Sequence, residues 1–442
     1  NEDDIVLDRA DASWDLKAHK VKRGVVVQRW AVVVFASKQQ CSESQARAFA
    51  AQLVKVAAEH GVALGHEVSV IHASLQTPIA QTLQLVQTMQ LAVCVLPTTS
   101  TSVYGEIKRV AYTQLGVHTQ CVQLAHTRGS RAKLLASIVL KINTKLGGLT
   151  QTASLPLPSK LLENTMVVSA DVCHTTESGM SVASIVWSVD AGAQRFSGLV
   201  VQHPKRQEII ENFDVVIRHA LRSYYAHTRV KPSRIVYYRD GVSDSQLADI
   251  RRVELASLVR GCALVEKGYA PQISIIIARK RHHTRFMLAN EQNCVPGTVV
   301  THLASPRVFS FYMVAHHAVC GVAKPVYYMV LHNACGFRAH ELYELTFYLG
   351  FAYPIVTRPV TMPASLYYAH RLSGKGRLQI NCPFDELPYF AQRQNHYRRN
   401  VGDNSSSNSN SKQTSSNKKN KKAVPVHLVP VHSKLADTMY FM

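Results

Sequence analysis

One acidic residue, Asp240, stands at the end of an apolar run in the stretch SRIVYYRDGVSDSQ. The run Ile235–Tyr238 has the composition of a buried strand, and Gly241 directly after the acid is a turn signal. A carboxylate at a strand end beside a turn is a common place for ligand or metal chemistry in α/β folds. The alternative is that Asp240 only caps the turn, and one acid does not decide between the two.

A second run of the same kind, MVVSAD at Met166–Asp171, also ends in an acid, and Cys173 and His174 follow it closely. Two carboxylates carried by strands can bind the same divalent ions, and oxygen-rich sites suit Mg²⁺ or Mn²⁺. The two runs together therefore predict metal-dependent chemistry, with turn capping as the alternative for each acid.

The composition favours a basic, soluble, intracellular protein that binds a polyanion. The 442 residues carry a formal charge of +21, and nucleic acid is the default partner for such an excess on a globular body. The segment 398–422 holds seven basic residues and one acid, which leaves about +15 for the rest. A basic surface with no specific partner is the alternative. The chain begins at Asn1, which predicts a piece of a longer protein.

Nine cysteines are scattered singly, without a CxxC pair. This odd number and spacing predict reduced thiols in the cytosol or nucleus, and disfavour a disulfide framework or a zinc site. No signal peptide is evident, and apolar runs such as Ala31–Ala36 and Leu91–Leu96 are too short to cross a bilayer.

The first part of the chain alternates between strand and helix patterns. Strands are expected at 24–36, 66–71 and 91–96, and helices at 45–59, 77–89 and 103–115. This βαβα alternation predicts a parallel sheet covered by helices, which is a Rossmann-like domain. We place this domain at 23–147, after a polar segment at 1–22 and before a connection at 148–163 rich in proline and turn formers.

The second part, 164–442, has a different order of elements. Three strands follow one another at 166–171, 183–190 and 196–202, and a long helix is expected from about Lys205 to Tyr225. A capping box at Ser243 and Gln246 then predicts a helix after the strand that ends at Asp240. Neighbouring strands followed by alternating helix and strand fit an RNase H-like α/β fold.

Nearly the whole chain resembles the MID and PIWI domains of eukaryotic Argonaute proteins. The resemblance rests on a series of stretches in a fixed order: VYGEIKRV, VHTQCVQ, KINTKLGGL, ADVCH, HPKRQEIIENF, YRDGVSDSQ, KRHHTR and PASLYYAH. It implies a MID domain of Rossmann type, a PIWI domain of RNase H type, and a role in RNA silencing: binding a small guide RNA and cutting the complementary target RNA. It also implies cytoplasmic localisation, with the nucleus as the alternative, and silencing proteins as partners.

Tyr104 and Lys108, four residues apart, share one face of a predicted helix, and Lys141 and Lys145 repeat this spacing in another. Several cations can converge on a phosphate, and a tyrosine ring can stack on a terminal base. The alternative is that the lysines at 141 and 145 are solvated helix positions. The resemblance assigns to the guide's 5′ phosphate or its end the residues Tyr104, Lys108, Gln120, Lys141, Lys145, Arg358 and Lys375.

The resemblance also implies a catalytic tetrad that cuts RNA and leaves 5′-phosphate and 3′-hydroxyl ends. Cleavage of this kind uses two metal ions about 4 Å apart, one for the attacking water and one for the leaving oxygen. Asp171, Asp240 and His370 match the metal ligands, and Glu208 matches the mobile glutamate that completes the set. Each residue also has a purely structural alternative. An aspartate such as Asp171 could cap a turn, His370 could be a packed histidine, and Glu208 could be an acid that favours the start of a helix.

Further basic residues match positions that contact the sugar-phosphate backbone, where RNA helices are recognised mostly by shape while base pairing carries the sequence information. These residues are Arg281, His283, Arg285, His316 and Lys324. The adjacent His282 and His283 could be taken for part of a zinc site, but no second pair of ligands stands at the spacing that such a site requires.

Three features depart from the family pattern. Lysine replaces arginine at 324 and 375, which keeps the charge but loses the bidentate geometry. The usual proline is missing after Asp171, and the segment 289–297 is short. Residues 404–422 are almost entirely Ser, Asn and Lys, and predict a disordered loop before a buried C-terminus.

Two alternatives to a cleaving enzyme stay open. A catalytically silent guide-binding scaffold would recruit silencing partners, and a general double-strand binder would show no preference for a 5′ phosphate. The sequence leaves open whether the guide is RNA or DNA.

Overall fold

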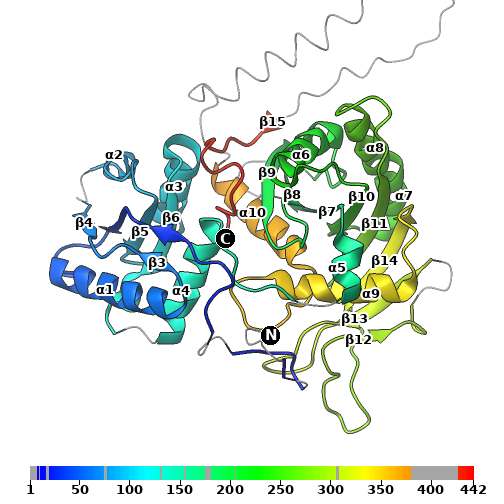
Figure 1. Ribbon diagram of the computed structural model, residues 1–442, viewed down its shortest axis with the longest axis horizontal. Coiled ribbons are helices and arrows are strands. Elements are labelled where there is room, and N and C mark those ends of the chain that lie inside the picture. Colours follow the sequence, from blue (N-terminus) through cyan, green and yellow to red (C-terminus); the bar gives the residue numbers. More distant parts are fainter. Residues whose placement is uncertain are drawn as a thin grey trace, which may run out of the picture.

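The structure is a computed structural model. It describes residues 7–8, 10–15, 19–73, 77–129, 132–153, 156–174, 181–204, 206–304, 308–379 and 427–442. Two main sheets lie side by side, each covered by its own helices (Figure 1). Among the described residues, no helix is both long enough and apolar enough to span a membrane.

The first sheet has four parallel strands in the order β4-β2-β5-β6. Its strands are β2 (Trp30–Val34), β4 (Ser69–His72), β5 (Leu91–Leu96) and β6 (His118–Gln123). Strands β2 and β5 are buried at every position, because helices cover both faces. The parallel, helix-covered sheet confirms the predicted Rossmann-like fold.

The helices around this sheet follow the predicted pattern with shifted ends. They are α1 (Glu43–Glu59), α2 (Ile79–Gln84), α3 (Thr101–Val110) with its π-helical continuation η1 (Ala111–Leu115), and α4 (Ala132–Lys145). Helix α1 starts two residues before the predicted Gln45, because the Ser42 side chain accepts from the backbone of Gln45 and caps it. Helix α2 is shorter than predicted and continues in turns.

Within the part of the chain that the structure describes, the second sheet has nine strands in the order β12-β13-β14-β11-β10-β7-β8-β9-β15. Its central strands are β7 (Thr165–His174), β8 (Ser181–Ser188), β9 (Phe196–His203), β10 (Arg234–Asp240) and β11 (Gln272–Arg279). The outer ones are β12 (Thr298–Val300), β13 (Ser310–Val314), β14 (Val326–Asn333) and β15 (His427–Leu428). Strand β10 is parallel to both β7 and β11, and the antiparallel β7-β8-β9 meander agrees with the predicted RNase H-like order.

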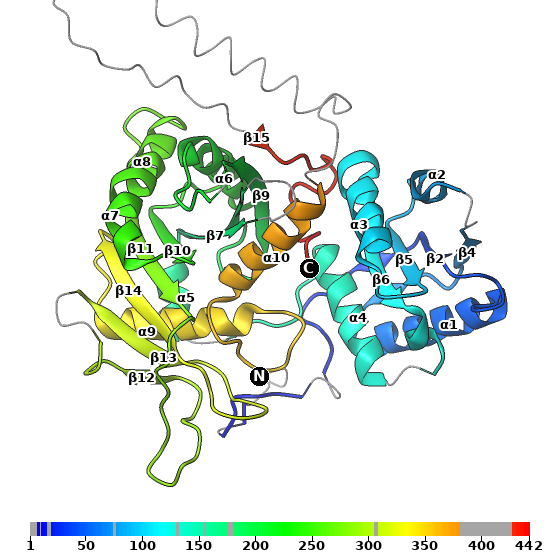
Figure 2. The same cartoon turned by 180° about the vertical axis from the view of Figure 1, so that it is seen from behind.

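Several helices cover this sheet. They are α5 (Pro156–Leu162), α6 (Phe213–Thr228), α7 (Leu247–Asp249), α8 (Leu255–Ala263), α9 (Ala339–Tyr348) and α10 (Ala364–Gln379). The predicted capping box at Ser243 and Gln246 is present. Helix α10 packs on β7 and β8 and also touches α3, so it lies between the two sheets (Figure 2).

Two predictions about local structure were wrong, and the predicted connection holds a helix that was not predicted. Strand β7 continues three residues beyond Asp171, because its ladder with β8 extends to His174, so this acid is not at a strand end. Helix α6 begins at Phe213 and not near Lys205, since Asn212 has a left-handed backbone that a regular helix cannot include. The connection at 148–163 contains the short helix α5.

The predicted buried C-terminus is present, whereas the predicted disordered loop at 404–422 lies outside the described residues. Tyr440, Phe441 and Met442 are buried, and the Tyr440 carbonyl accepts a 2.9 Å hydrogen bond from the Tyr112 hydroxyl. Tyr112 belongs to η1, which follows α3. The chain end therefore supports a helix of the first sheet while lying against the second (Figure 1).

Candidate functional site

Six predicted residues form one group, which we call the lysine cluster: Tyr104, Lys108, Gln120, Lys141, Lys145 and Lys375. Helix α3 carries Tyr104 and Lys108 one turn apart, and α4 carries Lys141 and Lys145 in the same way. Gln120 lies on β6, which packs against α4.

The two innermost ammonium groups converge on a single carbonyl oxygen. Lys108 Nζ donates to the Thr119 carbonyl at 2.9 Å and to Thr119 Oγ1 at 2.7 Å. Lys145 Nζ donates to the same carbonyl at 3.0 Å and to Gln120 Oε1 at 2.7 Å. Lys108 and Lys145 are 2% and 3% exposed. All of these acceptors are neutral, so the two charges lie buried side by side without a carboxylate among these bonds.

Burial and neighbouring cations disfavour the positive charges of Lys141 and Lys145, whereas the pKa of Lys108 is raised, because Cys121, Tyr112 and Cys94 outweigh its burial. Burial, and then the charge of Lys108, lower the pKa of Lys145 well below its usual value. Burial, and then the charge of Arg371, lower the pKa of Lys141. An anion bound here would relieve this penalty, because it would supply the counter-charge that these neutral acceptors cannot. Arg371 was not predicted from the sequence, where its only signal is that it follows His370.

Lys375 reaches the cluster from a helix that packs on the second sheet. It lies on α10, and its Nζ donates to the Tyr104 hydroxyl and lies 4.6 Å from the centre of the Tyr104 ring. Burial lowers the pKa of Lys375 to about 8. Since α10 packs on the nine-stranded sheet, the cluster combines residues from elements that belong to the two different sheets. No described contact joins Arg358 to it: that residue is half-buried and interacts electrostatically with Asp11.

The second group, which we call the acid cluster, consists of Asp171, Glu208, Asp240 and His370. Strands β7 and β10 are adjacent and parallel, with Ala170 opposite Arg239, so Asp171 and Asp240 stand at the same level. Burial and the charge of Asp171 raise the pKa of Asp240. His370, on α10, places Nδ1 3.2 Å from Asp171 Oδ2. That hydrogen bond raises the pKa of His370.

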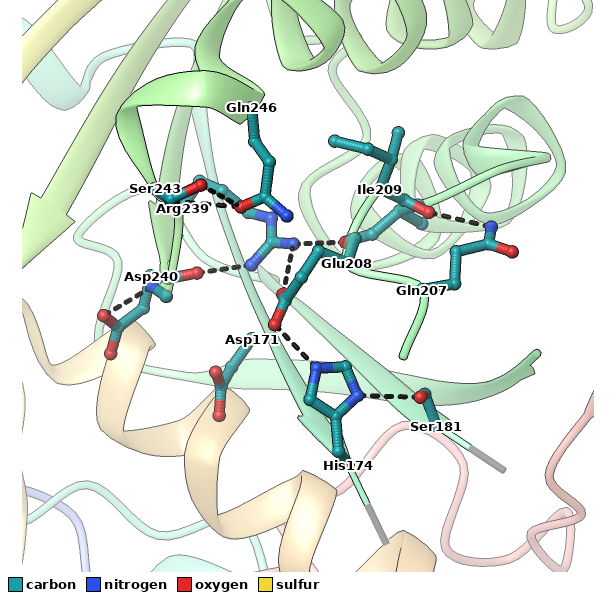
Figure 3. A network of polar contacts seen from close by, with 12 residues as sticks. Asp171, His174, Ser181, Gln207, Glu208, Ile209, Arg239, Asp240, Ser243 and Gln246 are labelled. Carbon is teal, nitrogen blue, oxygen red and sulfur yellow. Dashed lines mark hydrogen bonds and ion pairs between the residues drawn. The ribbon is translucent and has the colours of Figure 1, made fainter. Parts of the chain in front are cut away.

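Glu208 lies in the loop between β9 and α6, and its side chain points toward His174 (Figure 3). Glu208 Oε1 lies 2.8 Å from Nε2 of His174, whose Nδ1 lies 2.7 Å from the Ser181 hydroxyl. Because a carboxylate only accepts, Nε2 carries a proton, and in the neutral ring Nδ1 accepts from Ser181. His174 therefore orients Glu208 and is itself oriented by Ser181.

The buried Arg239 ties the Glu208 loop to the strand that carries Asp240. Its Nη2 donates to the Glu208 carbonyl at 2.6 Å, and its Nη1 donates to the Asp240 carbonyl (Figure 3). Glu254 lies 3.5 Å from Arg239 Nε and also accepts a 2.8 Å bond from the Tyr237 hydroxyl. Arg239 and Glu254 are fully buried, so they form a fixed support below the acid cluster.

None of these supporting contacts was predicted from the sequence. His174 and Arg239 stand next to the predicted acids in the motifs ADVCH and YRDG, and that proximity was the available signal. No such signal pointed to Glu254, because it lies far from the predicted acids in the sequence, within a helical pattern.

The donor set of the acid cluster fits a hard divalent ion. Asp171 and Asp240 offer carboxylate oxygens at one level of the sheet. Glu208 Oε2 has no hydrogen-bond partner among the described residues and lies 3.7 Å from Arg239 Nη2. Within the described residues, however, no three His, Cys, Asp or Glu side chains are grouped closely enough to hold a metal ion. The structure thus brings Asp171 and His370 into contact and keeps the Glu208 carboxylate on His174.

The predicted backbone-contacting residues lie on irregular segments around β11, β13 and β14. Arg281, His283 and Arg285 follow β11 and are exposed, and Arg285 Nη1 donates to the carbonyls of His282 and Thr284. Lys324 is exposed before β14, and His316 is half-buried after β13. None of them takes part in the lysine cluster or the acid cluster among the described contacts.

Two family models match the chain: the Piwi domain over residues 91–381 and the Mid domain of argonaute over residues 10–84. Among solved structures, Drosophila Piwi is similar with a TM-score of 0.73 and 24% identity, over 84% of this chain and 52% of that one. The C-terminal lobe of a budding yeast Argonaute is similar with a TM-score of 0.80 and 21% identity, over 99% and 92% of the two chains.

Kluyveromyces polysporus Argonaute, solved with a guide RNA, is also similar, with a TM-score of 0.80 and 21% identity over 99% of this chain and 55% of that one. The chain therefore spans about half the length of the Drosophila and Kluyveromyces structures. At these identities the likeness to solved structures establishes the fold.

Proposed function

Because this chain belongs to the Argonaute family, we propose that it binds the 5′-phosphorylated end of a small guide RNA. The observation that carries this proposal is the lysine cluster, where Lys108 and Lys145 are buried against the Thr119 carbonyl with neutral acceptors only. A terminal phosphate dianion supplies the missing counter-charge. Tyr104 provides a ring on which the first base can stack.

We further propose that the chain cuts a target RNA paired with the guide, leaving 5′-phosphate and 3′-hydroxyl ends, as an effector of RNA silencing. Asp171, Asp240 and His370 would hold the divalent ions, Mg²⁺ or Mn²⁺. Such ions lower the pKa of a bound water and stabilise the leaving oxygen of an in-line displacement.

The chain's own residues prepare the acid cluster for this role. Arg239 fixes the level of Asp240 and the backbone at Glu208 through two carbonyl contacts. His174 restrains the Glu208 carboxylate in the loop beside the sheet. Glu208 would complete the ligand set of these ions once its side chain is released from His174.

The guide-target duplex would lie along the segments that carry Arg281, His283, Arg285, His316 and Lys324. Exposed cations on these segments suit phosphate contacts, which position a duplex without reading its bases. Base pairing with the guide then selects the target.

A non-cleaving guide-binding scaffold for silencing proteins is the second candidate. The position of Glu208 favours it, because this side chain bonds to His174 and no described triad of ligands is close enough for a metal ion. The two candidates share the lysine cluster and differ only in what the acid cluster does.

A cleavage assay separates them. The chain is loaded with a 5′-phosphorylated guide RNA, and binding is checked by fluorescence anisotropy before a complementary labelled RNA and Mg²⁺ are added. We expect one cut opposite the guide, lost with EDTA and in Asp240→Ala, and retained in Asp244→Ala. Asp244 is a suitable control because its side chain is 81% exposed in the short 3-10 helix after the same strand, and its ion pair is with Arg279, outside both clusters. A wild-type chain that binds guide but never cuts supports the scaffold.

Comparing 5′-phosphorylated with 5′-hydroxyl guides tests the lysine cluster. Equal affinity for both would reject guide-end recognition and leave only general binding of double-stranded RNA.

A further inference from the structure

Two cysteines stand opposite each other in the sheet beneath the lysine cluster. Strands β5 and β6 are parallel neighbours, and their register pairs Cys94 directly with Cys121. Paired residues of adjacent strands project to the same face and lie about 5 Å apart, which is within the span of a disulfide. Cys94 and Cys121 also pack in one apolar cluster with Ile107 and Val110 of α3. The two thiols therefore face the same helix, and both are free in this structure.

Cys121 lies beside the two buried lysines. Thr119 precedes it by two residues on β6, so the side chains of Thr119 and Cys121 share a face of the sheet. Lys108 Nζ donates to the Thr119 side chain, and Lys145 Nζ donates to the Thr119 carbonyl. Cys121 is partly exposed whereas Cys94 is completely buried, so a small reagent reaches Cys121 first.

The electrostatic surroundings give the two thiols different roles, with Cys121 as the nucleophile and Cys94 as the thiol that reacts with it second. The hydrogen bond with Cys94, together with the charges of Lys108 and Lys145, lowers the pKa of Cys121. The hydrogen bond with Cys121, together with burial, raises the pKa of Cys94 well above its usual value. A thiolate beside lysines, next to a second thiol, is the arrangement of a peroxide-reactive cysteine with its resolving cysteine.

We propose that Cys121 and Cys94 form a peroxide-reactive pair that closes to a disulfide when the lysine cluster is empty and is protected when a 5′ phosphate occupies it. The protection rests on the proposed function, whereas the reaction with peroxide does not. A phosphate on Lys108 and Lys145 neutralises the charges that favour the thiolate and blocks the approach to Cys121 from the cluster.

The chemistry is a two-electron oxidation by hydrogen peroxide. The Cys121 thiolate attacks one peroxide oxygen, the O–O bond breaks, and the departing hydroxide takes a proton to become water. Cys94 then gives up its proton as its sulfur attacks the sulfenic acid sulfur of Cys121, and a second water leaves as the S–S bond forms. Two thiols are oxidised and one peroxide is reduced to two waters. A bridge between directly opposed strand positions is strained, so we expect thiols to reduce it readily.

The test follows the thiols by intact mass and peptide mapping in the full chain. After brief treatment with hydrogen peroxide, we expect the guide-free protein to lose two hydrogens, with the peptides of Cys94 and Cys121 joined, and dithiothreitol to restore both. Cys94→Val should stop at a sulfenic acid on Cys121 that dimedone traps. Cys121→Ser should leave Cys94 unmodified. Cys41→Ser removes a buried thiol in the apolar cluster on the other face of the sheet, and it should leave the oxidation of Cys94 and Cys121 unchanged.

The same samples are then oxidised after loading, with guide binding measured by anisotropy. A 5′-phosphorylated guide should slow disulfide formation by at least about tenfold, and a 5′-hydroxyl guide much less. Equal oxidation of loaded and empty protein, with binding demonstrated, would overturn the link to the lysine cluster. Absence of the Cys94–Cys121 bridge in the empty protein would overturn the site itself. If no guide binds but the bridge forms, the proposed function fails while the reactive pair stands.

Discussion

The lysine cluster and the acid cluster differ in how completely the fold assembles them. In the first, each inner ammonium group makes two hydrogen bonds to neutral acceptors of β6, and Lys375 bonds to Tyr104. In the second, one direct contact joins two of the four residues, and Glu208 bonds outside the group to His174.

Neutral acceptors hold the inner lysines in place, whereas few contacts link the members of the acid cluster to one another. Amide and hydroxyl oxygens can hold like charges close together, as Thr119 and Gln120 do for the lysines, so the lysine cluster is arranged before its ligand binds. In the acid cluster each donor contacts a single carboxylate: the Gly241 amide donates to Asp240, His370 contacts Asp171, and Arg239 and His174 hold Glu208. We infer that guide binding needs little rearrangement, whereas the proposed cleavage would need the ions to complete the geometry.

The largest expected effect is on cleavage, and it tests whether the two clusters are separate. Asp171→Asn keeps an acceptor for His370 but loses the charge that would bind the ions, so cleavage should fall on the order of a thousandfold or more. Affinity for a 5′-phosphorylated guide should not change. Single-turnover cleavage and anisotropy give the two values. A parallel loss of both would show that the clusters act as one unit.

The next effect is on guide binding. Lys145→Ala removes one buried charge and its contact with the phosphate, and a charge-assisted bond of this kind contributes roughly 1.5–3 kcal/mol. We therefore expect affinity for a 5′-phosphorylated guide to fall between about 10- and 100-fold, with a much smaller change for a 5′-hydroxyl guide. Lys133→Ala is the matched control, because Lys133 is exposed on the first turn of the same helix. Cleavage at saturating guide should stay near the wild-type rate.

The sequence predicted the two clusters unequally, for a physical reason. Helical spacing alone places Tyr104 beside Lys108 and Lys141 beside Lys145, because contacts one turn apart are local. The parallel sheet and the strand ending at Asp240 followed in the same way from local patterns. Arg239 with Glu254, or Lys375 with Tyr104, depend on how distant elements pack, and no local pattern encodes that. The end of β7 was misjudged because pairing with β8, and not residue preference, sets it.

Removing the anchor of Glu208 should have a moderate effect. His174→Ala frees the Glu208 carboxylate from its 2.8 Å contact, so the loop must order itself when the ions bind, and cleavage should fall about tenfold. His174→Gln keeps a donor at this position and should restore part of the rate. Single-turnover rates at saturating guide measure the effect without interference from binding. A faster cut in His174→Ala would show that the contact holds Glu208 away from the ions.

The smallest effect concerns Lys375 and appears only as a dependence on pH. Burial lowers its pKa to about 8, so in the guide-free protein its charge is lost as pH rises through that value. A bound phosphate stabilises the charged form, so the complex keeps the proton to higher pH, and affinity must fall as pH increases. Between pH 7 and pH 9 we expect a roughly three- to fivefold loss for a 5′-phosphorylated guide.

Lys375→Arg isolates this contribution, because a guanidinium keeps its charge over the whole range. The pKa of Lys145 is also lowered, so the variant should keep some slope, and the difference between its slope and that of the wild type belongs to Lys375. Anisotropy titrations at several pH values and constant ionic strength give both slopes. Identical slopes would mean that Lys375 does not reach the phosphate, and that the lysine cluster is complete without the residue that α10 contributes to it.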